Sequence, residues 1–353
     1  MKLCIVFGTR PEIIKLSQII RICEDKKMDY FLIHTNQHYS KDMDEIFFRE
    51  LILPPPKYNL HIGSGTHGYQ VGEMLKEIEK ILILEKPDVV LVEGDTNAVL
   101  AGALSASKLK IKVAHVEAGL RSYDRNMPEE VNRIVVDHIS DFLFCPTKLQ
   151  EKILLKEGIE KEKIFVTGNT IVDAVLWVEK NQTEILKKMD IERNEYFLLT
   201  MHRAENVDSK ERLWYLVNEI TKLKDINIPI IFPMHPRTKK QLEQFGIFLP
   251  NIIKTCDPIG FNDMITLEKN AKCIFTDSGG IQEEACILKT HCVTLRTSTE
   301  RPETIEVGGN KLMGNDLLKD YNEIIKHEKN WKNPFGDGNT SKLILDYLTK
   351  NER

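Results

Sequence analysis

KLCIVFGTRPEIIK, residues 2–15, is the stretch of sequence that decides the fold. Its apolar run up to Phe7 predicts a buried strand, and Pro11 suits the first turn of the helix that follows. Arg10 and Lys15 then stand at the start of this helix, where the dipole favours a bound anion. A plain turn with solvent-facing charges is the alternative, because the stretch lacks the glycine patterns of dinucleotide sites and P-loops.

The same unit repeats outward along the whole chain, as apolar runs bounded by turn residues alternate with amphipathic helical patterns. This alternation is typical of parallel strands covered by helices. We expect strands at 2–8, 30–36, 88–94, 112–117, 142–146, 163–167, 196–201, 229–234, 251–256, 273–277 and 291–296. In the first half we expect helices near 11–25, 70–85, 97–109, 129–139, 147–157 and 170–189.

The predicted fold class is α/β, with two Rossmann-like, doubly wound parallel-sheet domains that face a central cleft. The chain of 353 residues is longer than one hydrophobic core usually organises. We place the first domain at 1–180 and the second at 190–340, with a helix at 341–353 that returns to the first domain. Because ligands of such sheets bind beyond the strand C-termini, the chemistry is expected immediately after the strands.

Composition excludes several classes of protein. The net charge is −4 and the basic residues are dispersed, which argues against a nucleic-acid or membrane surface. No apolar stretch reaches the roughly 18 residues of a membrane span, and the chain runs from Met1 straight into a strand without a signal peptide. We therefore expect a cytoplasmic protein, whose seven cysteines, odd in number and without a C-x-x-C pair, are reduced and buried.

Three carboxylates of the first half follow predicted strands or open a predicted helix. Asp95 follows strand 88–94 and can also serve as a helix N-cap, and Glu117 ends the next strand. Glu129 lies in a first helical turn, where the helix dipole favours carboxylates anyway. Helix capping is thus the competing explanation, but three acids at one edge of a sheet favour acid–base chemistry.

Two histidines of the second half follow its first two strands. His202 stands beside Arg203 after strand 196–201, a position that rarely serves core packing. His235 follows strand 229–234, where Pro236 could equally begin a helix, so a ligand role and a capping role are equally supported.

The sequence from Thr276 to Glu284 predicts a strand, a Ser-Gly-Gly turn and a helix. Ser278, Gly279 and Gly280 suit a phosphate held by backbone N–H groups at a helix N-terminus, and Glu284 can accept hydrogen bonds from a ribose diol. Arg301 supplies a cation for the same diphosphate. Metal-like spacings such as His34 with His38 lack the rest of a ligand set, so we predict that no metal is required.

Together these motifs resemble the non-hydrolysing UDP-N-acetylglucosamine 2-epimerases, whose two-domain fold is similar to that of GT-B glycosyltransferases. The resemblance spans nearly the whole chain. It rests on FGTRPEIIK at 7–15, NQH at 36–38, EGDT at 93–96, HVEAGLRS at 115–122, MPEEVNR at 127–133, VTGNTIVDA at 166–174, HRAEN at 202–206, DSGGIQEEA at 277–285 and TERPE at 299–303.

The resemblance implies interconversion of UDP-GlcNAc and UDP-ManNAc for cell-surface polysaccharide synthesis. UDP would be eliminated to leave a 2-acetamidoglucal and then re-added, without a nicotinamide cofactor. The implied acid–base groups are Asp95, Glu117 and Glu129, with His202 beside the diphosphate. The implied substrate contacts are Arg10, Lys15, Arg203, His235, the backbone of Ile259, Ser278, Gly279, Gly280, Glu284 and Arg301. We also expect a homodimer.

Several alternatives stay open at this point. An activating second substrate molecule could bind at Gln37, His38 and Gln70, as in some bacterial members of the family. Ala204 departs from the family pattern, and Arg125 could serve a C6 carboxylate, so a related UDP-sugar such as UDP-2,3-diacetamido-2,3-dideoxyglucuronic acid or a 6-deoxy amino sugar is possible. A hydrolysing epimerase, a retaining glycosyltransferase and a UDP-sugar sensor are the other candidates.

Overall fold

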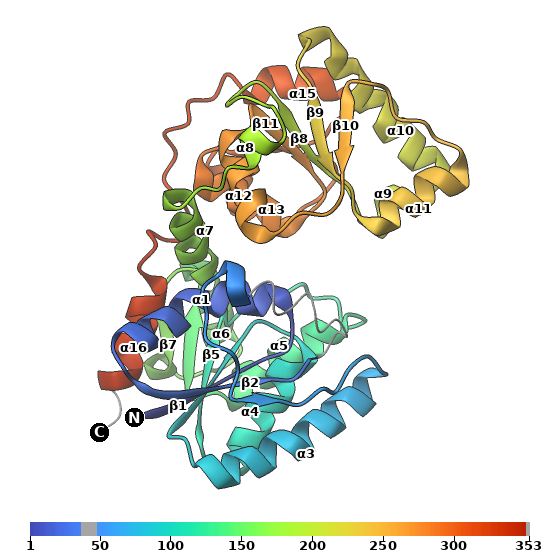
Figure 1. The fold of residues 1–353 in the computed structure, drawn as a ribbon. Coiled ribbons are helices and arrows are strands. Elements are labelled where there is room, and N and C mark those ends of the chain that lie inside the picture. The colour runs from blue at the N-terminus through green and yellow to red at the C-terminus, as the bar shows by residue number, and fades with distance from the viewer. Residues whose placement is uncertain (37–47, 351–353) are drawn as a thin grey trace. The chain divides into compact units, whose positions relative to one another are not determined.

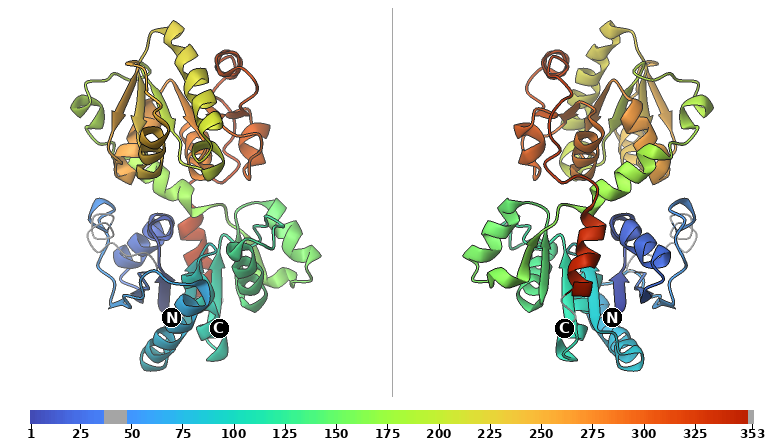
Figure 2. Two further views of the ribbon diagram at one scale, coloured as in Figure 1. Left: turned by 90° about the vertical axis from the view of Figure 1, so that its right-hand side faces the viewer. Right: turned by 90° about the vertical axis from the view of Figure 1, so that its left-hand side faces the viewer.

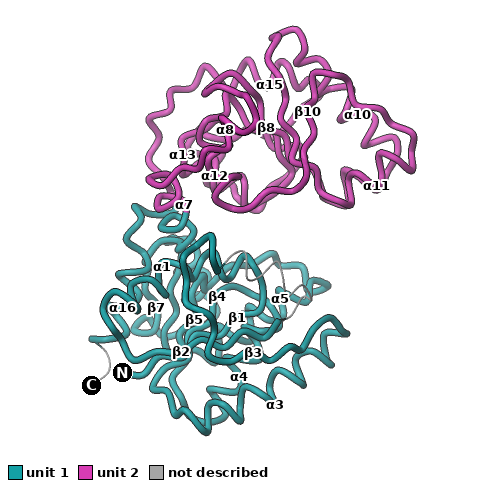
Figure 3. Tube along the Cα trace, viewed as in Figure 1, with its two compact units in different colours: residues 1–174, 335–353 teal, residues 175–334 magenta. Residues whose placement is uncertain are grey.

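The computed structural model describes residues 1–36 and 48–350, and its chain forms two compact units (Figures 1 and 3). Unit 1 comprises Met1–Ala174 and Phe335–Arg353, and unit 2 comprises Val175–Pro334. The division falls inside helix α7 (Thr170–Lys180), slightly before the linker that the sequence suggests. Each unit is an α/β layer structure with helices on both faces of its sheet (Figure 2).

Unit 1 contains a seven-stranded, entirely parallel sheet. Its strands are β1 (Lys2–Phe7), β2 (Asp29–His34), β3 (Tyr58–Asn59), β4 (Val89–Glu93), β5 (Lys112–Val116), β6 (Phe142–Cys145) and β7 (Ile164–Val166). Its helices are α1 (Arg10–Asp25), α3 (His67–Glu85), α4 (Asn97–Lys108), α5 (Pro128–Ile139), α6 (Lys148–Lys156), the 3-10 turn η1 (Lys161–Lys163), the first part of α7 and α16 (Thr340–Lys350).

Unit 2 contains a six-stranded, entirely parallel sheet. Its strands are β8 (Phe197–Thr200), β9 (Ile230–Pro233), β10 (Ile253–Cys256), β11 (Cys273–Thr276), β12 (Cys292–Thr294) and β13 (Asn310–Leu312). Its helices are α8 (Ile185–Lys188), α9 (Ala204–Val207), α10 (Lys210–Thr221), η2 (Lys222–Ile226), α11 (Pro236–Phe245), α12 (Phe261–Asn270), α13 (Gly279–Leu288), α14 (Pro302–Glu306) and α15 (Leu317–Ile324).

Both sheets reverse their strand order at one place. The order is β3-β2-β1-β4-β5-β6-β7 in unit 1 and β10-β9-β8-β11-β12-β13 in unit 2. The chain therefore leaves β1 and β4 toward opposite faces of the first sheet, and it does the same after β8 and β11 in the second. Such switch points open a crevice beyond the strand C-termini. Both predicted doubly wound sheets are confirmed.

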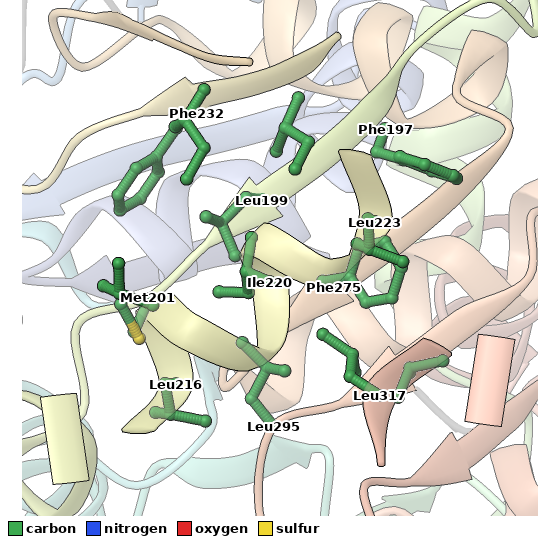
Figure 4. Packing of buried hydrophobic residues seen from close by; sticks show 14 of the residues in the cluster. Phe197, Leu199, Met201, Leu216, Ile220, Leu223, Phe232, Phe275, Leu295 and Leu317 are labelled. Atoms are coloured by element: carbon green, nitrogen blue, oxygen red, sulfur yellow. The ribbon is translucent and has the colours of Figure 1, made fainter. Parts of the chain in front are cut away.

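The core of unit 2 shows why the strands of these sheets are short runs of apolar residues. Alternate residues of β8 lie on opposite faces: Phe197 and Leu199 pack with α10 and α15, whereas Leu198 packs with Leu267 and Ala285 of the helices on the other face. Figure 4 shows the first of these two layers. A strand that is covered on both faces needs apolar residues at every position, which is what the sequence provides.

Helix α16 completes unit 1 after the chain has built unit 2. The buried carboxylate of Asp173 accepts hydrogen bonds from the backbone N–H groups of Thr340 and Ser341 at 3.3 and 2.9 Å. Tyr347 stacks on Phe165 of β7 with 4.7 Å between ring centroids. The helix thus packs beside α1 and against β6 and β7, in the sheet to which the N-terminal part of the chain belongs.

The structure departs from the sequence-based expectations at a few elements. Strands β3 and β13 were not predicted, because both are short and contain polar residues, as Tyr58-Asn59 and Asn310-Lys311-Leu312. The single helix expected at 170–189 is two helices, α7 and α8, separated by polar residues 181–184. Residues 351–353 of the expected C-terminal helix lie outside the described residues.

Two bulk features complete the description. All seven cysteines are free thiols, six of them buried and Cys256 half-buried, as the sequence predicts. Among the helices of 1–36 and 48–350, none has the length and apolar character of a bilayer span.

Candidate active site

Lys15 gathers the carboxylates of unit 1 at the switch point. Its Nζ lies 3.0 Å from Oε1 of Glu93, the last residue of β4, and 2.5 Å from Oε2 of Glu117, which follows β5. Helix α1 directs Lys15 toward these groups, because α1 starts directly after the neighbouring strand β1. Lys15 and Glu117, which the sequence singled out separately, are therefore in direct contact.

This cluster holds more carboxyl groups than a single ammonium can neutralise. Burial raises the pKa of Glu93 well above its usual range; Lys15 opposes this shift and the nearby Glu117 adds to it. Burial also raises the pKa of Glu12 to about 7, although Gly8 N–H and the hydroxyls of Thr9 and Thr96 donate to its carboxylate. Burial and the neighbouring Glu117 thus favour the protonated form of Glu93, and both carboxyl groups lie within 3.0 Å of the Lys15 ammonium group.

The backbone beside this cluster is unusual. Glu117 adopts a left-handed conformation with φ 68°, which a non-glycine residue enters only at a cost in free energy. Asn169 donates to its second oxygen, Oε1, at 3.1 Å. Both oxygens of Glu117 are therefore held, and its carboxylate has one fixed direction.

Asp95 belongs to a second ionic group. Arg133 of α5 contacts Asp95 Oδ2 through Nη2 at 2.5 Å and Glu130 Oε2 through Nη1 at 2.8 Å. Thr96, not Asp95, caps α4 by accepting from Val99 N–H, so the predicted capping role of Asp95 is wrong. The Asp95 carboxylate therefore does not cap α4 and pairs with Arg133 instead.

Glu129, the third predicted acid, lies in the first turn of α5 as expected. It is partly exposed, whereas its neighbour Glu130 is buried and accepts from the backbone N–H groups of Ser122 and Tyr123, at 2.9 Å each. Glu130 therefore shapes the loop before α5, and Glu129 is the member of the pair that a ligand could reach.

His115 of β5 holds the loop after β4 in place. Its Nδ1 lies 2.7 Å from Asp137 Oδ1 and its Nε2 lies 2.8 Å from the carbonyl oxygen of Gly94. Burial by itself would lower the pKa of His115, but Asp137 outweighs burial and the pKa is raised. Since both partners accept hydrogen bonds, we assign a proton to each ring nitrogen. The imidazolium anchors Gly94, the residue before Asp95.

In unit 2, the buried carboxylate of Asp277 organises the switch point. It accepts from the backbone N–H groups of His202 and Arg203 at 3.0 and 2.9 Å and from Asn206 Nδ2 at 3.1 Å. A residue after β11 thus fixes the loop after its neighbour β8. Burial lowers the pKa of His202, so its ring is neutral near pH 7. The ring of His235 lies 5.4 Å away, between ring centroids.

His235 is occupied as a helix cap. Its Nδ1 accepts from Arg237 N–H at 3.1 Å, and Pro236 opens α11. Next to it, an open pocket of 450 Å³ lies entirely in unit 2. Its lining includes one imidazole and three guanidinium groups: His202, Arg203, Arg237 and Arg296, together with Ala204 and Glu205. Arg237 pairs with Asp208, and Arg296 pairs with Glu205 and Glu300, so a bound anion would compete with these carboxylates.

The Ser-Gly-Gly turn opens α13, with Ser278 as its N-cap. The Ser278 side chain makes no capping hydrogen bond, as far as residues 1–36 and 48–350 show. A Cβ atom at Gly279 or Gly280 would have its nearest neighbours at 4.0 and 3.8 Å, and neither residue has a positive φ. Neither the described packing nor the backbone requires glycine there, which favours close approach of a ligand.

The remaining predicted contacts of unit 2 surround α13. Arg301 Nε lies 2.6 Å from Glu283 Oε1, so its guanidinium is fixed against this helix. The side chain of Ile259 is half-buried against the core layer of α12 and α13. Glu284 is half-buried and faces another carboxyl group, that of Glu268.

Only one residue of the predicted activator site can be located. Gln37 and His38 lie outside the described residues. Gln70 is buried; its Nε2 donates to Gly63 O at 2.7 Å and its Oε1 accepts from Asn97 at 2.9 Å. Its amide is thus engaged within unit 1.

Sequence reasoning missed the residues that hold the predicted ones in place. They are Glu12, Glu93, Glu130, Arg133, Asp137, Asn169, Glu268 and Asp277. A signal existed for Glu93 and Asp277, since each is a carboxylate at the C-terminal end of an otherwise apolar run.

Comparison with known proteins gives a match over almost the whole chain. A family model described as UDP-N-acetylglucosamine 2-epimerase matches residues 21–349. A protein of that name from Methanocaldococcus jannaschii is 58% identical over 363 residues, covering 99% of both chains. Another of that name from Methanococcus maripaludis is 56% identical, covering 98% of both. A crystal structure of the M. jannaschii enzyme with UDP-GlcNAc and UDP has a TM-score of 0.87 and covers 99% of this chain and 100% of its own.

Proposed function

We propose that this chain, which belongs to the UDP-N-acetylglucosamine 2-epimerase family, inverts C2 of UDP-GlcNAc and so interconverts this sugar with UDP-ManNAc. The observation that carries the proposal is the identity of 58% over 99% of both chains with an enzyme of that name. The two switch points supply groups of the two kinds that the reaction needs, acids in unit 1 and anion-binding groups in unit 2.

The first step breaks two bonds of the sugar. The C1–O bond breaks and UDP leaves with the electron pair, while a carboxylate takes the C2 proton, so that a C1–C2 double bond forms. The C2 proton has no neighbouring carbonyl to acidify it, so positive charge must develop at C1 as UDP departs. We assign the departing diphosphate to Ser278, Gly279 and Gly280 at the start of α13, with Arg301, and neutral His202 as a hydrogen-bond donor.

The second step reverses the first from the other face of the ring. A carboxylic acid returns a proton to C2, and the diphosphate oxygen attacks C1. Two acid–base groups are therefore needed, and we assign them from Asp95, Glu117 and Glu129. Lys15 pairs with Glu117 and Arg133 pairs with Asp95, through contacts of 2.5 Å each. No electrons are gained or lost overall, so the steps balance without an oxidant or reductant.

Heavy water tests this proposal. Incubation with UDP-GlcNAc in D₂O should give UDP-ManNAc that carries deuterium at C2, which NMR and mass spectrometry detect. Stoichiometric free UDP with a free mannosamine derivative would instead identify a hydrolysing epimerase. Absence of both exchange and turnover would contradict the proposal for this sugar.

A parallel incubation addresses the sugar substituents. Arg125 lies in the exposed loop before α5 and could face a C6 carboxylate. The same D₂O assay with UDP-2,3-diacetamido-2,3-dideoxyglucuronic acid should be slow if UDP-GlcNAc is the substrate. Faster exchange with the glucuronic acid derivative would reassign the substrate within the same reaction class.

We further propose a cytoplasmic homodimer that supplies precursors for a cell-surface polysaccharide. The exposed side chains of Tyr69, Ile83 and Leu84 on α3 support an apolar contact between subunits. Light scattering after size exclusion should give twice the chain mass of 40.7 kDa. A mass of one chain at micromolar concentration would contradict the dimer.

A further inference from the structure

His115 is a buried residue of β5 whose side chain reaches the neighbouring loop, the one after β4. The residue is 1% exposed. Its Nε2 lies 2.8 Å from the carbonyl oxygen of Gly94, and its Nδ1 lies 2.7 Å from Oδ1 of Asp137 on α5. Both ring nitrogens therefore face oxygen atoms, one on a loop and one on a helix.

Asp137 connects this contact to the loop after β5. Its second oxygen, Oδ2, accepts from the backbone N–H group of Gly119 at 3.2 Å and from Nη1 of Arg121 at 2.7 Å. Burial by itself would raise the pKa of Asp137, but His115 and Arg121 outweigh burial and the pKa is lowered. The loops after β4 and β5 thus share one buried carboxylate of α5 as their anchor.

Helix α5 also holds Asp95 directly. Asn132 Nδ2 donates to the Asp95 carbonyl oxygen at 2.8 Å, and Arg133 Nη2 lies 2.5 Å from the Asp95 carboxylate. The Gly94 carbonyl and the Asp95 N–H group belong to one peptide plane, so a contact with this carbonyl sets where Asp95 begins. A Cβ atom on Gly94 would lie 3.8 Å from Oε2 of Glu117, so this peptide runs beside the Glu117 carboxylate.

We infer that His115, anchored by Asp137, is a positioning residue for the acid–base groups of unit 1. By holding the Gly94 carbonyl, it keeps Asp95 at a set spacing from Glu117. This inference rests on the proposed function, in which these two carboxylates are candidates for moving the C2 proton. Spacing matters because a displacement of about 1 Å at a reacting group can lower turnover about 10²-fold.

Two substitutions of His115 separate its two contacts. The amide nitrogen of glutamine lies as many bonds from Cβ as Nε2 does, so His115→Gln can still donate to the Gly94 carbonyl. The amide nitrogen of asparagine corresponds to Nδ1, so His115→Asn can donate to Asp137 but releases the Gly94 carbonyl. We expect both variants to lower the melting temperature, because each removes a buried hydrogen bond.

Deuterium exchange at C2 of UDP-GlcNAc, with the folded fraction measured by circular dichroism, provides the test. In His115→Asn, kcat should fall about 10²-fold, whereas KM and the Kd for UDP should stay within about twofold. In His115→Gln, kcat should stay within about tenfold of the unmodified protein. His138→Asn, at an exposed histidine of the same helix α5, is the control and should leave kcat unchanged. A purely structural role would lower the melting temperature of both His115 variants without separating their kcat values.

A double-mutant cycle shows whether His115 acts through Asp95. Asp95→Asn removes the carboxylate, so adding His115→Asn to it should lower kcat by less than about threefold more. Losses that multiply would overturn the positioning role. Equal losses of kcat in His115→Gln and His115→Asn would overturn it as well, because the contact with Gly94 would then not be what matters.

Failure of this inference differs from failure of the proposed function. If the unmodified protein exchanges no deuterium at C2, the proposed function fails and the inference fails with it. If Asp95→Asn exchanges at the full rate, the assignment of Asp95 is wrong and there is nothing for His115 to position. If Asp95→Asn loses exchange while His115→Asn keeps it, the positioning role alone is overturned.

Discussion

At the switch point of unit 1, the ammonium group of Lys15 pairs with both Glu93 and Glu117, and burial raises the pKa of Glu93 and of nearby Glu12. The corresponding place in unit 2 has one buried carboxylate, Asp277, fully supplied with N–H donors. The two sheets have the same order of strands, so topology sets where ligands bind and leaves the chemistry to the residues that follow the strands. The proposed function accordingly assigns the proton transfers to unit 1 and the binding of the diphosphate to unit 2.

Glu117→Gln should have the largest effect on the difference in chemistry between the two switch points. It removes an acid–base group from unit 1, so kcat should fall by about 10²-fold to 10⁴-fold, measured as deuterium exchange at C2. UDP affinity, which we assign to unit 2, should change by less than about twofold. The control is Glu160→Gln, an exposed glutamate of the same unit. Equal losses of turnover and UDP affinity would refute the division of labour.

Asp277→Asn tests the donor-saturated carboxylate of unit 2. The amide would direct its own N–H group at the N–H donors of His202, Arg203 or Asn206. We expect the free energy of unfolding in urea to fall by about 2 to 4 kcal/mol and UDP binding to weaken. Asp225→Asn, at an exposed site of unit 2, should have almost no effect. An unchanged urea midpoint for Asp277→Asn would show that this network is dispensable.

Glu12→Gln tests whether the Glu12 carboxyl group binds its proton more tightly in the folded state than in the unfolded chain. The folded-state pKa of about 7 lies above the ordinary value of 4.5, so the native state binds this proton more tightly than the unfolded chain. Its contribution to stability is complete below about pH 4.5 and is lost as the pH rises through 7. Glutamine cannot ionise, so its stability relative to the unmodified protein should rise by up to about 3 kcal/mol between pH 5 and 8.5.

Urea titrations at several pH values measure this difference. The exposed Glu79→Gln variant serves as the control and should show no such trend. If the difference between Glu12→Gln and the unmodified protein is constant with pH, Glu12 is ionised throughout the range, contrary to the assignment above.

Gly280→Ala adds one methyl group to the Ser-Gly-Gly turn of unit 2 and tests whether the diphosphate binds there. A methyl group fits, since its nearest neighbour is Ser278 Oγ at 3.8 Å, so stability should rise by about 0.5 kcal/mol. UDP binding should nevertheless weaken about tenfold, because the methyl group would occupy the approach of the phosphate. Gly68→Ala in α3, also at the second residue of a helix and with no heavy atom within 4 Å, is the matched control. UDP binding that survives Gly280→Ala would move the diphosphate elsewhere.

Sequence patterns predicted both sheets, because buried parallel strands are apolar throughout and their helices are amphipathic. They also predicted which loops carry polar groups, since those loops follow the strands. They could not predict that Thr96 displaces Asp95 as the cap of α4, which is decided by backbone geometry at one turn. Nor could they show that Glu93 and Glu117 share the ammonium group of Lys15, because this contact depends on segments that meet only after folding.

The return of α16 to unit 1 has a consequence for biosynthesis. Unit 2 is a continuous segment, Val175–Pro334, and can acquire its native core as soon as it leaves the ribosome. Unit 1 is interrupted by it, and Asp173 receives its partners Thr340 and Ser341 only after unit 2 has been translated. We therefore expect the nascent chain to gain nucleotide affinity before it gains turnover, because the proton-handling half must wait for its final helix.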